Sequence, residues 1–154
     1  MKRFHIHLCV ENLEKSIAFY SNLFAAGPTR QEADYAKWML EDPRVNFAIS
    51  THGTAAGIEH LGFQTDDETE LAEMKARAKV ANLSLHDEGD TTCCYARSDK
   101  YWITDPQGIP WEHFRTLGNV PMFSDMRTSA ICHTGESPAA QTLDTSLSAK
   151  STCC

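Results

Sequence analysis

The chain runs through one order of segments twice, and this internal duplication limits the folds open to it more than any other feature. His5 opens the first copy and His60 opens the second. The copies close on similar turns, with the sequence KWMLEDPR at 37–44 and KYWITDPQ at 100–107. Such a repeat usually reflects a duplicated structural unit, and two copies that pack together share one interior.

Hydrophobic spacing predicts a strand, a helix and further strands in each copy. Residues 3–10 alternate between apolar and polar side chains, which indicates a strand whose histidines share one face. Helical spacing follows, from the expected N-cap Asn12 to a stop at Gly27. The other predicted elements are strands at 38–40 and 45–50, then a strand at 58–65, a helix at about 68–81, and strands near 83–86, 92–96, 101–104 and 110–116. The predicted fold class is α+β, with two tandem modules at about 3–52 and 57–117 that form one concave mixed sheet.

Composition limits the partners and the compartment. A net charge of -7 and the lack of a basic stripe disfavour nucleic acid and anionic membranes as partners. No apolar run is long enough for a membrane span, and polar residues interrupt the start of the chain, so we expect a soluble cytoplasmic protein. The expected domain is 1–123, followed by a flexible, cysteine-containing tail at 124–154.

Two histidines and one glutamate form a candidate metal site. If the modules pair about a twofold axis, His5 and His60 face each other, and Glu112 enters from the last strand of the second module. Two imidazoles and one carboxylate suit a non-haem Fe(II) or a related divalent ion with open positions. The matching region of the first module, 47–49, offers no fourth ligand. The alternative is that the histidines are hydrogen-bonded pocket residues and Glu112 is a surface carboxylate.

His7 competes with His5 for the metal. The two lie on the same face of one strand, so periodicity alone cannot separate them. The repeat favours His5, because His60 aligns with it, whereas the equivalent of His7 is Gly62. We expect His7 to line the pocket or to support a ligand.

Two adjacent cysteines, Cys93 and Cys94, lie in a segment where the second module is longer than the first. Neighbouring thiols close a disulfide with each other only under strain. A soft centre can bridge them, and a trivalent arsenical with one carbon substituent has two valences left for two thiolates. The alternative is one buried and one exposed cysteine on an ordinary strand.

These segments resemble the vicinal oxygen chelate superfamily, which includes glyoxalase I, extradiol dioxygenases and the fosfomycin and bleomycin resistance proteins and shares paired βαβββ modules. The resemblance covers about residues 3–117. Its motifs are HIHLCVENLEKSIAFY, EHLGF and DPQGIPWE. The segment DTTCCYARSDKYWITDP is similar to one branch of the superfamily, the carbon-arsenic bond lyases and cadmium-inducible proteins.

The resemblance implies an enzyme that uses Fe(II) and dioxygen to cleave the carbon-arsenic bond of trivalent methyl or aromatic arsenicals and releases arsenite. By position, His5, His60 and Glu112 would hold the iron, and Cys93 with Cys94 would hold the arsenic. Mn, Ni, Zn or Co could occupy the same site, and a homodimer is compatible with the sequence. Some members of the branch have glutamine in place of His5. Two alternatives are a cytosolic cadmium- or arsenic-binding protein without catalysis and a glyoxalase-like isomerase, which would normally need a fourth protein ligand.

Overall fold

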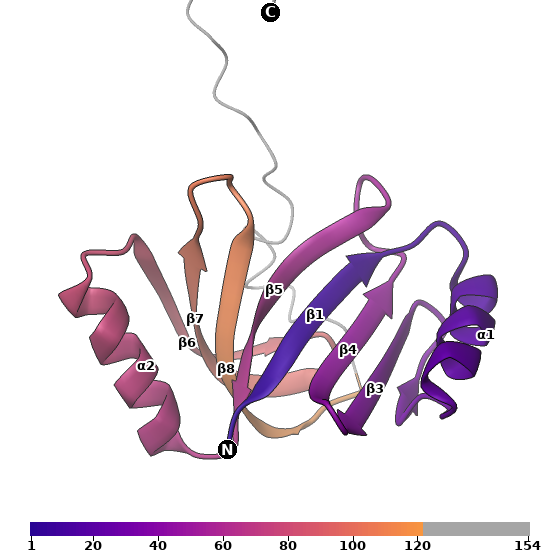
Figure 1. The fold of residues 1–154 in the computed structure, drawn as a ribbon, viewed down its shortest axis with the longest axis horizontal. Coiled ribbons are helices and arrows are strands. Elements are labelled where there is room, and N and C mark those ends of the chain that lie inside the picture. Colours follow the sequence, from indigo (N-terminus) through magenta and orange to yellow (C-terminus); the bar gives the residue numbers. More distant parts are fainter. Residues whose placement is uncertain (122–154) are drawn as a thin grey trace, which may run out of the picture.

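The predicted repeat of strand, helix and strands is present in the computed structural model, which describes residues 1–121 (Figure 1). The first module contains β1 (Arg3–Cys9), α1 (Leu13–Phe24), β2 (Arg30–Gln31), β3 (Tyr35–Glu41) and β4 (Arg44–Ser50). The second contains β5 (Gly57–Thr65), α2 (Glu68–Val80), β6 (Leu85–Cys93), β7 (Ala96–Thr104) and β8 (Pro110–Asn119). The α+β class and the modular organisation are therefore confirmed.

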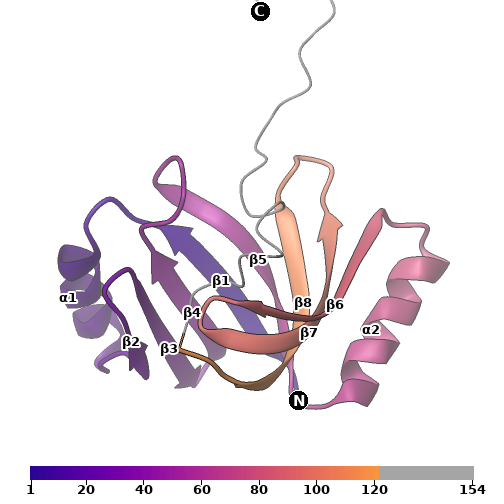
Figure 2. The same ribbon diagram turned by 180° about the vertical axis from the view of Figure 1, so that it is seen from behind.

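All strands of residues 1–121 join one eight-stranded sheet in the order β2-β3-β4-β1-β5-β8-β7-β6. The modules meet where β1 pairs antiparallel with β5, and each of these strands pairs in parallel with the last strand of its own module. The sheet curls into an open half-barrel with α1 and α2 on its outer side (Figures 1 and 2). The first strands of the two modules consequently lie side by side at the centre of the concave sheet.

The helices cover the outer side of the sheet because each presents one apolar stripe. Asn12 caps α1 as predicted, since its side chain accepts a hydrogen bond from the Lys15 amide. Apolar residues of α1 pack on buried Trp38 and Phe47, whereas Leu71 of α2 packs against Tyr101. The apolar face of β1 joins this outer core, which leaves the histidine face of β1 for the interior of the half-barrel.

The second module differs from the prediction around the cysteines. The separate strands expected near 83–86 and 92–96 are wrong, because β6 is continuous and the chain reverses directly after it. Cys93 pairs with Ala96, and the two intervening residues, Cys94 and Tyr95, have φ angles of 56° and 62°. A two-residue hairpin turn of this kind needs positive φ at both positions. The residues between the two predicted strands, 87–91, lie in β6, which has a register shift between Asp87 and Gly89.

The predicted tail at 124–154 lies outside the described residues. Neither α1 nor α2 has the length and apolar character needed to cross a bilayer.

Candidate active site

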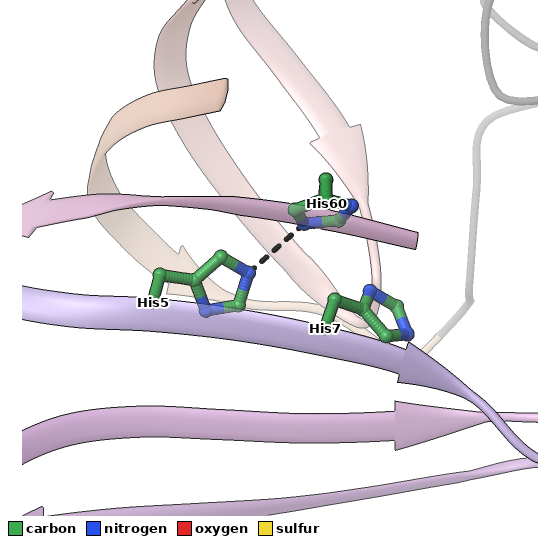
Figure 3. Close-up of side chains that lie close together, drawn as sticks. All are labelled: His5, His7 and His60. Carbon is green, nitrogen blue, oxygen red and sulfur yellow. Dashed lines mark hydrogen bonds between the residues drawn. The ribbon is translucent and has the colours of Figure 1, made fainter. Parts of the chain in front are cut away.

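The structure brings His5, His60 and Glu112 together inside the half-barrel, on β1, β5 and β8 (Figure 3 shows the two histidines). All three side chains are buried. The Nε2 atoms of His5 and His60 lie 3.0 Å apart. Glu112 Oε2 lies 3.6 Å from His5 Nε2 and 3.4 Å from His60 Nε2. The centre of such a triangle is about 2 Å from each atom, which matches the distance from a transition metal to nitrogen or oxygen ligands.

Hydrogen bonds orient both imidazoles with Nε2 toward this centre. His5 Nδ1 donates to the carbonyl oxygen of Asn46 at 3.0 Å. His60 Nδ1 lies 3.2 Å from Glu59 Oε2 and donates to it. When Nδ1 carries the donated proton, the Nε2 lone pair is available to a metal, and such partners usually accompany histidine ligands.

Lys100 orients the Glu112 carboxylate. Its ammonium Nζ, almost fully buried, donates to Glu112 Oε1 at 2.9 Å and lies 3.5 Å from Glu88 Oε2. Glu112 therefore directs one oxygen to Lys100 and the other to the two histidines. The sequence offered one signal for Lys100, since it opens the repeated KYWITDP segment just as Lys37 opens KWMLEDP.

Gly62 permits the close contact between β5 and β8 that places Glu112. A Cβ atom at Gly62 would lie 1.8 Å from the backbone oxygen of Glu112. This steric limit explains why glycine occupies the repeat position equivalent to His7.

We expect Gly62→Ala to push β8 away and to lower both stability and metal affinity. Overpacking typically costs about 1–3 kcal/mol, and here it acts directly on a candidate ligand. Thermal denaturation and a Co(II) titration measure the two effects. Gly118→Ala on β8 is the matched control, because no atom lies within 4 Å of the added Cβ. Equal metal affinity in the two variants would contradict the expectation.

Burial and charge divide the protons unevenly among these residues. Burial and the nearby His60 lower the pKa of His5 to about 4. Burial also acts to lower the pKa of His60, but hydrogen bonds to Glu112 and Glu59 and the charges of these residues raise it to about 9. Burial opposes ionisation of Glu112, yet Lys100 and His60 hold its pKa well below the usual range. The two facing histidines therefore hold one extra proton, which resides on His60. The carboxylates of Glu59 and Glu112, which both contact His60, favour a cation at this position.

We expect a metal ion to displace this proton. At pH 7 the metal-free His60 is protonated, because its pKa is about 9, and a metal needs the neutral ring. Metal binding should therefore release close to one proton, and affinity should fall about tenfold for each pH unit below 9. Calorimetric Mn(II) titrations at pH 7 in buffers of different ionisation enthalpy count the protons. Binding with no proton release would show that this charge distribution is wrong.

His7 lies directly opposite His60 in the sheet and is almost fully buried. Its Nε2 lies 3.0 Å from Ser50 Oγ, and its Nδ1 lies 3.0 Å from the Glu59 carboxylate that also binds His60. Burial and His60 lower its pKa to about 3. His5, His7 and His60 each offer a nitrogen within 4.8 Å of the others, so this three-histidine group could also hold a metal ion (Figure 3).

The thiol pair lines the same cavity as the metal-site candidates. Cys93 and Cys94 are both partly buried, and their sulfur atoms lie 3.1 Å apart. The alternative of one buried and one exposed cysteine therefore does not describe this pair. The cavity has a volume of about 30 Å³, and its walls include His5, Lys100 and Glu112. The sequence did not predict that Lys37, Asn46 and Glu59 lie in this region. The one sequence signal for Glu59 was its position directly before the candidate ligand His60.

The fold and the site define the class of the chain. It belongs to the Glyoxalase/Bleomycin resistance protein/Dioxygenase superfamily, whose model matches residues 2–113. A solved structure with the same fold is the 2,3-dioxygenase LapB from Pseudomonas sp. KL28, with a TM-score of 0.58 and 21% sequence identity. That match covers 81% of this chain and 44% of LapB.

Two curated relatives are more similar in sequence. The chain is 46% identical to the "Trivalent organoarsenical cleaving enzyme" of Bacillus sp. (strain MD1) over 123 residues, which is 78% of this chain and 76% of the relative. It is 35% identical to the "Cadmium-induced protein CadI" of Mycobacterium tuberculosis (strain ATCC 25618 / H37Rv), over 80% of this chain and 82% of the relative. The predicted resemblance to the superfamily and to this branch is confirmed.

Proposed function

We propose that this protein cleaves the carbon-arsenic bond of a trivalent organoarsenical, using Fe(II) and dioxygen, and releases arsenite. The observation that carries the proposal is one cavity lined both by the thiol pair and by His5 and Glu112 of the candidate metal site. Similarity to a named organoarsenical cleaving enzyme supports the substrate class.

In this proposal, His5, His60 and Glu112 hold the iron. The histidine nitrogens and the carboxylate oxygen already lie at the mutual spacing that such an ion requires. When bound, Fe(II) supplies open coordination positions and the electrons that activate dioxygen. Mn, Ni, Zn or Co fit the same donors, so the metal is identified only by loading and assay.

Cys93 and Cys94 capture the arsenic. Each sulfur replaces one hydroxyl on arsenic, and water leaves with the thiol proton, so the arsenical stays uncharged while its carbon substituent remains in the cavity. Lys100 lines the same cavity as Cys93 and Cys94, so its ammonium is placed to balance negative charge that develops on an attacking sulfur. The main contribution of the protein is to position the arsenical beside the triad in one small cavity.

The overall reaction balances without a further reductant. For the methyl compound, CH3As(OH)2 and O2 contain the atoms of As(OH)3 and CH2O, with the carbon oxidised and dioxygen reduced. We expect equal amounts of dioxygen consumed and arsenite released.

The test uses the full chain purified without air, loaded with Fe(II) and mixed with trivalent methylarsenical. Arsenite and dissolved oxygen are followed together, and an anaerobic sample is the control. Arsenite release that needs both Fe(II) and oxygen supports the proposal. Tight arsenic binding without release would instead favour metalloid sequestration, a second candidate suggested by the vicinal thiols themselves.

A glyoxalase-like isomerase is separated by the same assay, because an isomerase consumes no dioxygen. His7 lies in one group with His5 and His60 and, together with Glu112, would make four possible donors, so the number of donors alone does not decide this alternative.

A further inference from the structure

The thiol hairpin, defined as β6, β7 and the turn between them, is bound to the first module at its tip. Arg30 on β2 donates from Nη1 to the Tyr95 carbonyl at 2.8 Å and from Nη2 to the Val120 carbonyl at 2.9 Å. Its guanidinium also lies 5.0 Å from the centre of the Tyr95 ring. The hairpin reaches across the half-barrel toward β2 and β3 (Figure 2), although 65 residues separate the two contacting positions.

A second bond joins the same tip to the loop before β3. The Tyr95 hydroxyl donates to Asp34 Oδ1 at 2.5 Å, and the other Asp34 oxygen lies 2.6 Å from His52 Nε2. The Asp34 carbonyl accepts a hydrogen bond from the Thr51 amide, which fixes the loop as well. Burial opposes ionisation of Asp34, but Tyr95 and His52 lower its pKa, whereas burial and Asp34 raise the pKa of Tyr95 to about 12. At neutral pH a phenol therefore donates to a carboxylate, which is a strong hydrogen bond.

This contact sets how closely the thiols approach the metal-site candidates. Tyr95 directly follows Cys93 and Cys94 in a tight turn, so the turn cannot lift away while the Tyr95 hydroxyl holds Asp34. The cavity under the hairpin has a volume of about 30 Å³, which exceeds the roughly 10–15 Å³ that one buried water molecule needs. A benzene ring occupies engineered cavities of roughly 150 Å³. A methyl group on arsenic is therefore accommodated in the closed site, whereas an aromatic ring requires the hairpin to move.

We propose that Arg30, Asp34 and Tyr95 form a hairpin latch that makes the site selective for methyl over aromatic arsenicals. The inference rests on the proposed function, since it concerns the substituent of the arsenical that Cys93 and Cys94 capture. A ligand that needs the open hairpin must overcome the free energy of the latch, whereas one that fits the closed site does not. Weakening the latch should therefore raise the affinity for aromatic arsenicals and leave the affinity for methyl arsenicals nearly unchanged.

The experiment compares trivalent methyl- and phenylarsenicals on the full chain. Thiol titration measures the affinity for each compound, and arsenite release from the Fe(II)-loaded protein measures turnover. The variants are Tyr95→Phe, which keeps the ring under Arg30, Asp34→Ala, and the double variant. Asp90→Ala is the matched control, because it removes an exposed carboxylate bonded to Arg97 within the same hairpin and away from the first module.

We expect the ratio of phenyl to methyl affinity to rise about tenfold in each single variant, the factor typical of losing one hydrogen bond to a charged group. The double variant should show no further rise, because both changes remove the same bond. An unchanged ratio in Tyr95→Phe, or an equal rise in Asp90→Ala, would overturn the latch. If the wild-type protein binds neither arsenical, the proposed capture fails and the inference fails with it. If it binds both without turnover, the proposed catalysis is wrong, but the ratio of phenyl to methyl affinity still tests the latch.

Discussion

Alanine in place of His5, His60 or Glu112 is expected to abolish stoichiometric iron binding. Each change removes one corner of a triangle whose sides are 3.0, 3.4 and 3.6 Å. Residues that only orient a metal ligand typically contribute 10- to 100-fold to affinity, so loss of a ligand should exceed about 100-fold. Iron content after anaerobic loading and desalting is the measurement.

His7→Ala is the comparison that distinguishes the triad from the three-histidine group. It should retain iron and lose activity by about 10- to 100-fold at most, because His7 shares the Glu59 carboxylate with His60 and therefore affects a ligand indirectly. Iron loss in His7→Ala together with iron retention in His5→Ala would show that the repeat register identified the wrong histidine.

Glu112 needs a further control, because its removal leaves the buried Lys100 ammonium without its closest carboxylate. Breaking a buried ion pair costs about 3–5 kcal/mol, so Glu112→Ala could lose iron by unfolding. Glu112→Gln combined with Lys100→Met removes both charges at nearly constant volume. A cooperative melt with no bound iron in this double variant would assign the loss to the carboxylate ligand itself.

The second large effect is expected at the thiols. Cys93→Ser and Cys94→Ser each replace a soft thiolate by a hydroxyl that stays protonated at neutral pH. A two-point attachment to arsenic becomes a one-point attachment, and the affinity should fall by about 10²- to 10⁴-fold. Iron binding should survive in both variants, because neither sulfur belongs to the proposed triad.

Glu112→Gln should show the opposite separation, with arsenic bound and no arsenite released. An arsenic titration and an iron assay on these three variants test both sites at once. Iron loss in the cysteine variants would place the thiols among the metal ligands, and undiminished arsenic affinity there would exclude the capture role.

Much of the fold was predictable because its signals are local. Alternation identified β1 and its histidine face, Asn12 marked the start of α1, and the repeat established that a second module follows the same order. The hairpin was mispredicted because two positive φ angles at Cys94 and Tyr95 carry no sequence signal in residues other than glycine or asparagine. The two-residue strand β2 was also absent from the prediction, since so short an element has no period.

The sequence by itself determined the duplication, the two modules and the residue types that suit a metal and an arsenical. These features follow from periodicity and from the chemistry of individual side chains. Only the tertiary structure decided which groups complete the site: Glu59 beneath His60, Lys100 on Glu112, Gly62 against β8, and Arg30 and Asp34 on the thiol hairpin. Except for the adjacent pair Glu59 and His60 on β5, each of these contacts joins different strands or loops and links positions that are separated along the chain. Their distances depend on how the two modules close around one cavity, and local sequence patterns do not encode that closure.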